Sequence, residues 1–304
     1  MNEQVRHELG RIARMSANEF VTMVKDLPPR DGPFERCAII NARCGRCSED
    51  CRFCGQSVFA TSTIAGWDLI GEEEICSAAR EAGEWGVARF GIVVSGRGPD
   101  DMDTRRLARL VQAVARDASL PKICLSPGIC DKEALLEFKT AGLVRFHHNL
   151  ETSESFFPNV CTTHTWKERM DTLVTARELG LELCCGGLFG LGESFLDRVD
   201  LAMQLAELAP ESVPVNFYVP VPGNQMDGLK PLSRDEIIRT LAMLRLALPQ
   251  SSIRLCGGRT LLGQGLEDAI RHLGLGALMT GNYLLTKGSS YESDRQMLDR
   301  LGVC

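Results

Sequence analysis

The chain has 304 residues, of which 24% are charged and 44% hydrophobic, with a net charge of −6 and a pI near 5.5. These are ordinary globular proportions; no apolar run approaches the roughly 18 residues needed to span a bilayer, and the acidic balance excludes the basic stripe of a nucleic-acid-binding protein. We therefore expect small-molecule ligands and no nucleic-acid or membrane partner.

Short apolar segments alternate with longer amphipathic segments along the whole chain, which is the pattern of repeated βα units and a parallel sheet. The predicted strands are Arg36–Asn41, Ala88–Ser95, Lys122–Ser126, Val144–Leu150, Glu182–Phe189, Val213–Val219, Ser252–Cys256 and Ala277–Leu284. The predicted helices are Asn18–Lys25, Glu72–Trp85, Thr104–Asp117, Lys132–Ala141, Trp166–Leu179, Leu196–Leu208, Arg234–Leu248 and Leu262–His272.

This alternation predicts an α/β fold with a TIM-type (βα)8 barrel, complete or nearly so, and a chain of this length can form it as one domain. We expect a single domain over residues 1–304, with residues 1–35 as an N-terminal helical extension that plugs or flanks the barrel. Catalytic residues of such a barrel lie at the C-terminal ends of its strands or in the loops that follow them.

The loop after the first predicted strand carries Cys47, Cys51 and Cys54 in a CxxxCxxC spacing. A 4Fe-4S electron carrier takes four thiolates, so three thiolates leave one iron free to bind a reacting molecule. S-adenosylmethionine (SAM) can chelate such an iron through its amino and carboxylate groups, and an electron from the cluster can then cleave its sulfonium to give a radical. The spacing therefore predicts a 4Fe-4S cluster, SAM and radical chemistry.

A structural zinc site is the main alternative, because zinc takes four Cys or three Cys and one His, and Cys44 is available as a fourth ligand. Disulfides are disfavoured, since the 13 cysteines are odd in number and residues 1–17 lack the apolar segment of a signal peptide. We expect thiols that are reduced or bound to metal, and a cytoplasmic location.

Cysteines also recur on alternate predicted strands: Cys37 on the first, Cys124 on the third, Cys184 and Cys185 on the fifth, and Cys256 on the seventh. Alternate strands of a barrel contribute side chains to the same interior layer, which makes a second metal site inside the barrel plausible. The alternative is that these thiols are small buried side chains, since free cysteine is among the most buried residue types. No role is predicted for the cysteines elsewhere, Cys76, Cys130, Cys161 and Cys304.

Further motifs accompany the cysteine triple. They are Cys47-Ser-Glu-Asp-Cys-Arg-Phe-Cys-Gly-Gln-Ser57, His148-Asn-Leu-Glu-Thr-Ser153, Thr165-Trp-Lys-Glu-Arg-Met-Asp-Thr172, Gly186-Gly-Leu-Phe-Gly-Leu-Gly-Glu193, Glu211-Ser-Val-Pro-Val-Asn216 and Ile253-Arg-Leu-Cys-Gly-Gly-Arg259. Together these motifs resemble the biotin synthases, radical SAM enzymes that insert sulfur between two carbons of dethiobiotin. The resemblance extends over nearly the whole chain.

The resemblance implies that the three cysteines hold the radical SAM cluster and that Phe53 packs against the adenine of SAM. Asn149 and Glu151 would hold the ribose hydroxyls, as acceptor oxygens can, and Arg169 would pair with the methionyl carboxylate through its guanidinium fork. The alternatives are a polar strand end for the first two residues and a solvated helix charge for the arginine.

The same resemblance implies that Asn216 hydrogen-bonds the ureido ring of dethiobiotin, since an amide both donates and accepts. Gly190 and Gly192 would let the backbone approach the cofactor, although glycines after a strand are also ordinary turn residues.

The motif for a second cluster is matched only in part. Familiar biotin synthases hold a sulfur-donating 2Fe-2S cluster on three cysteines and one arginine, of which Cys124, Cys184 and Arg254 are matched here. The strand-two position is Gly91, which cannot be a ligand. Cys37 and Cys256 offer replacement thiols, so the resemblance implies a re-ligated auxiliary cluster, either 2Fe-2S or a larger cluster with an extra sulfide.

A second departure is His147, which stands where an asparagine is usual near the substrate. A histidine can be a metal ligand or an acid/base, although most are only hydrogen-bonded polar groups.

The predicted function is therefore that of a biotin synthase, a sulfurtransferase acting on dethiobiotin, with Cys47, Cys51, Cys54, Asn216 and Arg254 as catalytic residues. The resemblance also implies a flavodoxin or ferredoxin reductant, the iron–sulfur assembly machinery and a homodimer. Two alternatives remain: another radical SAM barrel enzyme, such as a hydrogenase-cofactor maturase or a methylornithine-forming mutase, and a non-enzymatic iron–sulfur carrier.

Overall fold

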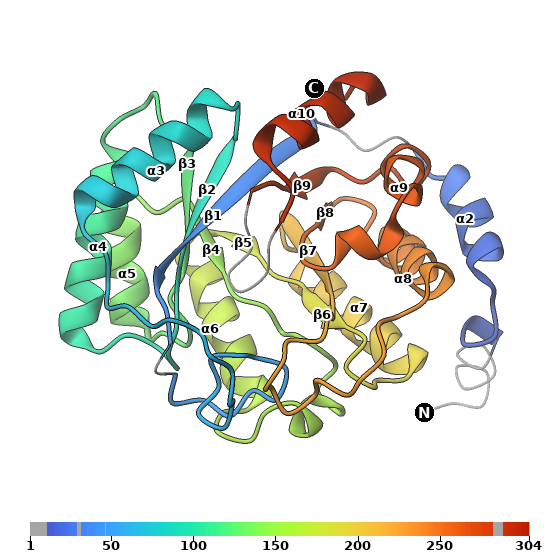
Figure 1. Ribbon diagram of the computed structural model, residues 1–304, viewed down its shortest axis with the longest axis horizontal. Helices are drawn as coiled ribbons and strands as arrows, with labels where there is room; N and C mark the ends of the chain where they lie inside the picture. Colours follow the sequence, from blue (N-terminus) through green and yellow to red (C-terminus); the bar gives the residue numbers. More distant parts are fainter. Residues whose placement is uncertain (1–10, 29–31, 46, 282–287, 304) are drawn as a thin grey trace.

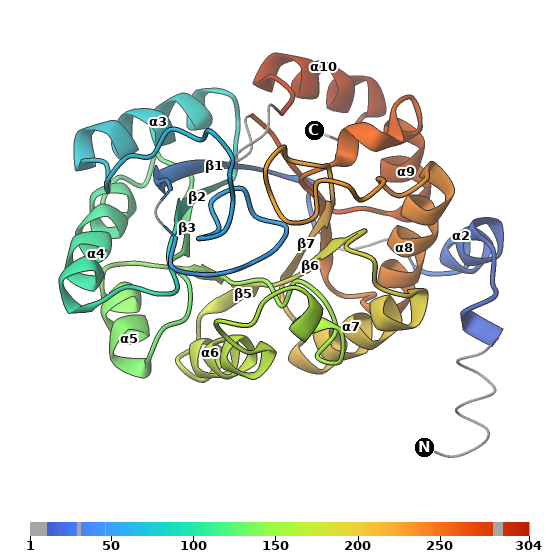
Figure 2. The same ribbon diagram turned by 60° about the horizontal axis from the view of Figure 1, so that its bottom comes forward.

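The computed structural model describes residues 11–28, 32–45, 47–281 and 288–303, and its strands form one closed parallel barrel surrounded by helices (Figures 1 and 2). The strands are β1 (Glu35–Arg43), β2 (Arg89–Val94), β3 (Lys122–Ser126), β4 (Arg145–His147), β5 (Glu182–Cys184), β6 (Gly187–Phe189), β7 (Ser212–Phe217), β8 (Ser252–Leu255) and β9 (Ala277–Met279). Their order is β5-β4-β3-β2-β1-β9-β8-β7-β6, and a β5–β7 pairing closes the ring. β5 and β6 occupy one strand position of the barrel, so the barrel has eight strand positions, as predicted.

The predicted fifth strand, Glu182–Phe189, is interrupted. β5 ends at Cys184 and β6 begins at Gly187, because the chain passes very close to β7 between them. A Cβ atom on Gly186 would lie 2.0 Å from the Pro214 carbonyl oxygen, so only glycine fits. The freed amide of Gly186 donates to Asn149 Oδ1 at 3.2 Å, which ties this break to the end of β4.

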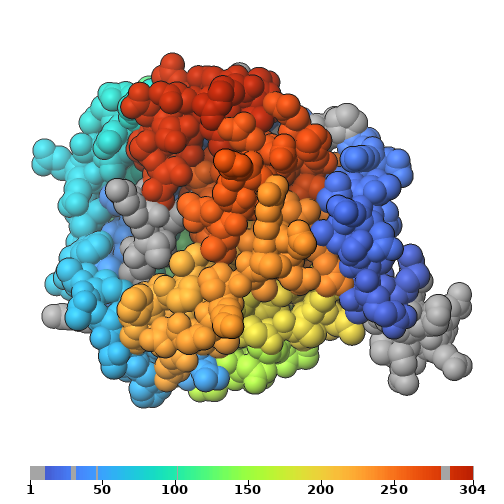
Figure 3. All heavy atoms as spheres, turned by 45° about the vertical axis from the view of Figure 1, so that its right-hand side comes forward, coloured from blue at the N-terminus to red at the C-terminus, as the bar shows by residue number. Residues whose placement is uncertain are grey.

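Most of the helices follow the predicted pattern. They are α2 (Ala17–Lys25), α3 (Glu72–Glu84), α4 (Asp101–Ala115), α5 (Lys132–Thr140), α6 (Trp166–Glu178), α7 (Phe195–Leu208), α8 (Arg234–Ala247), α9 (Gly265–Leu273) and α10 (Tyr291–Leu301). Capping boxes at Ser16, Thr165 and Ser194 begin α2, α6 and α7. The N-terminal helix α2 packs on the outside of α8 and α9, so it flanks the barrel and does not plug it (Figure 3).

Two differences between the observed and the predicted elements lie near the C-terminus. The predicted helix Leu262–His272 is preceded by a 3-10 turn, Arg259–Leu262, and starts later, at Gly265. Helix α10 has no counterpart among the predicted helices; it is mostly polar and buries only Asp294, Met297 and Leu298, so its apolar stripe is short. Of the predicted strand Ala277–Leu284, residues 282–284 lie outside the described residues.

The main hydrophobic core lies between the strands and the surrounding helices, with Val111, Leu135, Phe138 and Leu241 among its buried members. The barrel interior is different, because its small apolar cluster consists of Cys37, Cys256 and Met279. The centre of the barrel is thus left for polar and sulfur-bearing side chains. Among the described helices, none has the length and apolar character needed to cross a membrane.

Candidate active site

A cavity of about 340 Å³ extends down the barrel from the loop after β1. Its lining includes Phe53, Cys54 and Gln56 from that loop, Asn149, Glu151 and Asn216 from the ends of strands, and Cys37, Arg89, Cys124, His147, Cys184, Arg254 and Cys256 from the strand interior. Most of the residues singled out in the sequence therefore meet in one cavity at the catalytic end of the barrel.

The cysteine triple lies in the loop after β1, with Cys51 buried and Cys47 and Cys54 partly exposed. The amide of Cys54 donates to the Cys51 carbonyl at 3.0 Å, which makes a tight turn. Burial raises the pKa of Cys54 to about 11, as expected for a metal-free thiol in an apolar site. Of the three, only Cys54 lines the cavity, and Cys51 contacts Cys161. Three thiols in one short loop still fit a cluster that needs three protein ligands.

Cys44 is one candidate for the fourth ligand of the zinc alternative. Cys44 instead forms a backbone bridge with Trp67, with its amide donating to the Trp67 carbonyl at 3.1 Å. Cys44 belongs to none of the three-residue groups with metal-binding spacing in the described part of the chain. The 12 described cysteines are free thiols in this structure.

Four cysteines from different strands surround the lower part of the cavity: Cys37, Cys124, Cys184 and Cys256. Within the described residues, no three of them bring their sulfur atoms within 4.8 Å of one another. A single ion needs that convergence, whereas a polynuclear cluster holds its thiolates further apart. Cys124 lies opposite Gly91 on β2, where no side chain competes for space. These four thiols therefore fit a cluster better than a mononuclear ion.

Arginines and glutamates form the floor beneath these thiols. Arg89, Arg145 and Arg254 contact Glu35 and Glu182 at 2.7–3.6 Å, and three guanidiniums against two carboxylates leave one net positive charge. Nη1 of Arg89 and Nε of Arg254 are buried without a hydrogen-bond partner among the described residues. Buried donors left unpaired are costly, so the floor fits an anionic group such as a thiolate-bound cluster.

The thiols around this floor differ in their ionisation. Burial raises the pKa of Cys37 to about 11 and that of Cys124 to about 12. Burial also disfavours ionisation of Cys184, but His147 and Arg254 outweigh it and lower its pKa to about 6. His147 Nδ1 lies 3.1 Å from Cys184 Sγ, and Arg254 Nη1 donates to the same sulfur at 3.5 Å. These two contacts favour the thiolate form of Cys184.

The predicted SAM-binding residues meet beyond the end of β4, since Asn149 and Glu151 follow that strand and Arg169 lies near the start of α6. Arg169 Nη1 donates to the Asn149 carbonyl at 2.8 Å and lies 3.8 Å from Glu151 Oε1. Burial raises the pKa of Glu151, although Arg169 opposes it. Glu151 also has φ +67°, a strained conformation for a residue other than glycine and one that is concentrated at functional sites.

Asn216 and Phe53 both line the cavity. Asn216 accepts from the Gly257 amide at 3.0 Å, which fixes the orientation of its side-chain amide. Gly190 and Gly192, with φ +99° and +95°, form the turn after β6 and do not line the cavity within the described residues. Their conformation explains the glycines without a cofactor, so their contact with SAM stays a prediction.

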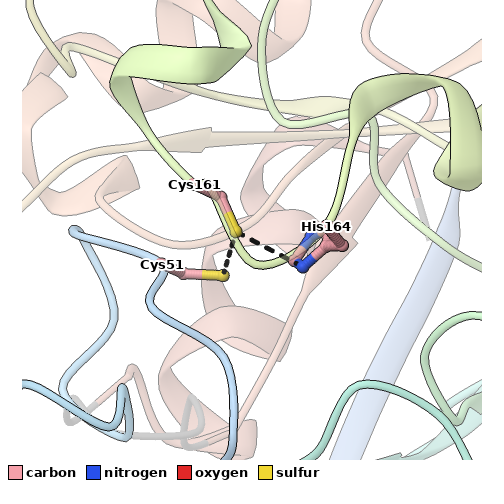
Figure 4. Close-up of side chains that lie close together, drawn as sticks. All are labelled: Cys51, Cys161 and His164. Carbon is pink, nitrogen blue, oxygen red and sulfur yellow. Dashed lines mark hydrogen bonds between the residues drawn. The ribbon is translucent and has the colours of Figure 1, made fainter.

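The sequence reasoning missed a buried group next to Cys51. Cys51 Sγ lies 3.7 Å from Cys161 Sγ, which is 3.3 Å from His164 Nδ1 (Figure 4). Asp50 accepts from the Thr162 amide at 2.8 Å, so the cluster loop is bonded to this segment. The Cys161-Thr-Thr-His164 spacing is that of a metal-ligand pair and was the available signal.

Sequence comparisons identify relatives of this chain. Residues 43–206 match the Radical SAM superfamily and residues 214–304 match the Biotin and Thiamin Synthesis associated domain. A biotin synthase of Clostridium perfringens is 41% identical over 88% of this chain and 83% of its own length. One from Pelotomaculum thermopropionicum is 44% identical over 86% of this chain and 81% of its own.

Solved structures share the fold at low identity. Methylornithine synthase has a TM-score of 0.79 at 19% identity, covering 98% of this chain and 91% of its own. The [FeFe]-hydrogenase maturase HydG has a TM-score of 0.78 at 15% identity, covering 99% of this chain and 78% of its own. These likenesses support the barrel fold and carry no information on substrate.

Proposed function

Because the chain belongs to the biotin synthase family, we propose that it converts dethiobiotin to biotin by SAM-dependent insertion of sulfur. The observation that supports this most is that one cavity connects Cys54 and Phe53 at its mouth with Asn216 in the middle and buried thiols at its floor. A carrier of electrons alone would need no such cavity. The hydrogenase-maturase and methylornithine-mutase alternatives are disfavoured by the identity to biotin synthases.

In this proposal Cys47, Cys51 and Cys54 hold the 4Fe-4S cluster. Cys37, Cys124, Cys184, Cys256 and Arg254 are the candidate ligands of an auxiliary iron–sulfur cluster, either 2Fe-2S or larger with an extra sulfide. When bound, the first cluster supplies the electron that cleaves SAM, and the second supplies the sulfur atom.

The protein's own residues position the reactants. Asn149 and Glu151 orient the ribose of SAM and Arg169 its carboxylate, while Asn216 holds the ureido ring of dethiobiotin. The barrel strands surround the lower part of the cavity, which limits the access of water to the reacting carbon from that side. The arginine floor places positive charge below the thiolates and stabilises their ionised form.

The wider proposal includes a flavodoxin or ferredoxin as reductant, the iron–sulfur assembly machinery, a homodimer and a cytoplasmic location. It also treats residues 1–304 as one catalytic domain, since β1–β6 and β7–β9 contribute to the same closed sheet.

The test is an anaerobic assay with dethiobiotin, SAM and a reductant that measures biotin and 5′-deoxyadenosine together. Cys37→Ala, Cys124→Ala and Cys184→Ala should form deoxyadenosine without biotin. The matched control is Cys185→Ala, because Cys185 is equally buried but does not line the cavity within the described residues. Deoxyadenosine without biotin from the wild type, with both clusters loaded, would assign a different substrate and contradict the proposal.

A further inference from the structure

A buried chain of hydrogen bonds links the cluster loop to Arg169. Glu49 lies between Cys47 and Cys51 and is 5% exposed, and His164 is 4% exposed. His164 Nδ1 is 2.5 Å from Glu49 Oε2, and Arg169 Nε donates to His164 Nε2 at 2.9 Å. These contacts connect a loop and a helix that lie more than 100 residues apart in the sequence.

The arginine decides how the imidazole is protonated. A guanidinium has donors only, so Nε2 of His164 must accept and the ring proton lies on Nδ1. Nδ1 therefore donates to the carboxylate of Glu49. Glu49 Oε2 also accepts from Thr163 Oγ1 at 2.8 Å, which fits a carboxylate in the acceptor role.

This tautomer also bears on whether Cys51, Cys161 and His164 could bind a metal ion. The ligand atoms of Cys51, Cys161 and His164 lie within 4.8 Å of one another, a spacing that a metal ion could bridge (Figure 4). A metal at Nδ1 needs a lone pair there, and the Arg169–His164 bond leaves a proton in its place. The geometry therefore favours a hydrogen-bond relay over a mononuclear metal site.

Arg169 is held on two sides by this arrangement. Nε bonds His164, Nη1 bonds the Asn149 carbonyl at 2.8 Å, and the guanidinium carbon lies 5.7 Å from the centre of the Phe157 ring. Nη2 makes no hydrogen bond to any of the described residues, so it is the donor left for a ligand. Loss of the His164 bond would release one of these two restraints.

We propose that His164 is a positioning residue, which fixes Arg169 relative to the cluster loop so that one SAM molecule can reach both. The inference rests on the proposed function, in which Arg169 binds the SAM carboxylate and the loop cysteines hold the iron that SAM chelates. Both contacts involve the same end of SAM, and misplacement of such groups by about 1 Å is costly. Glu49 anchors the relay to the loop.

The test uses two substitutions that each keep half of the relay. The amide of His164→Gln lies near the level of Nε2 and can accept from Arg169, whereas that of His164→Asn lies near Nδ1 and can only reach Glu49. SAM affinity is measured in the cluster-loaded protein from the shift of the reduced cluster's EPR signal, and KM for SAM from deoxyadenosine formation. His272→Gln, on the exposed face of α9, is the control.

We expect His164→Ala and His164→Asn to bind SAM about 10-fold or more weakly, the effect of losing a hydrogen bond to a charged group. His164→Gln should recover most of this affinity. KM for SAM should rise while kcat at saturating SAM and the iron content of the cluster stay near wild type.

Three results would overturn the inference: unchanged SAM affinity in His164→Ala, rescue by asparagine but not glutamine, or loss of one bound zinc or iron ion per chain with SAM binding intact. The last would assign the group as a metal site. SAM binding and cleavage are read without biotin formation, so a failure of the proposed substrate would leave this test valid.

Discussion

The pKa of the Cys184 thiol should depend on His147. In the metal-free protein the pKa of Cys184 is about 6, well below the usual value of about 8.5. Cys184 is 1% exposed, and its Sγ lies 3.1 Å from His147 Nδ1. A hydrogen bond to a charged group contributes about 1.5–3 kcal/mol. At 1.36 kcal/mol per unit, His147→Ala should raise this pKa by about 1–2 units.

The expected change is large near neutral pH. With a pKa of about 6, roughly nine-tenths of Cys184 is ionised at pH 7; in His147→Ala the fraction should fall to between about one-half and one-tenth. The thiolate is lost as pH falls through the folded-state pKa, so the variant should lose it at a higher pH than the wild type.

The assay is a pH titration of thiolate absorbance in the ultraviolet, with the curve of Cys184→Ser subtracted to isolate this one thiol. The exposed His272→Ala serves as the control. An unchanged Cys184 pKa in His147→Ala would show that the arginines alone stabilise the thiolate, and would refute the role given to His147.

Three further predictions concern stability and ligation. Asp294→Ala removes the buried 2.6 Å ion pair with Arg259 and should lower the unfolding free energy by about 1.5–3 kcal/mol in denaturant titrations, as loss of a hydrogen bond to a charged group does; a loss below about 1 kcal/mol would mean that the pair behaves like a surface pair. Gly186→Ala forces a Cβ to 2.0 Å from a β7 carbonyl oxygen, so we expect little soluble protein, and wild-type yield and melting temperature would contradict the packing argument. Cys161→Ala should keep cluster iron and deoxyadenosine formation, whereas Cys54→Ala should lose both; iron loss in the first variant would make Cys161 a cluster ligand.

The fold could be predicted from the sequence because the barrel is built from repeated local patterns. Each apolar segment followed by an amphipathic one predicts a βα unit, and the positions of nearly all strands and helices follow from that period. The pattern did not predict helix α10, because its few buried residues, such as Met297 and Leu298, give only a short apolar stripe among polar and charged residues.

The cysteine triple was also readable from the sequence, since Cys47, Cys51 and Cys54 are close in the chain and any loop that holds them keeps them together. The break at Gly186 was not readable, because the pattern of residues 182–189 suits one continuous strand. The cause of the break is the carbonyl of β7, which comes close only when the barrel closes.

The sequence by itself thus determined the barrel and the ligands that share one loop, while the tertiary structure decided which distant side chains meet. Cys184 lines the cavity and its neighbour Cys185 does not, a choice that a one-residue shift of register would reverse because side chains alternate along a strand. His164 reaches Glu49 across 115 positions. Such contacts depend on strand register and barrel closure, which no local spacing encodes.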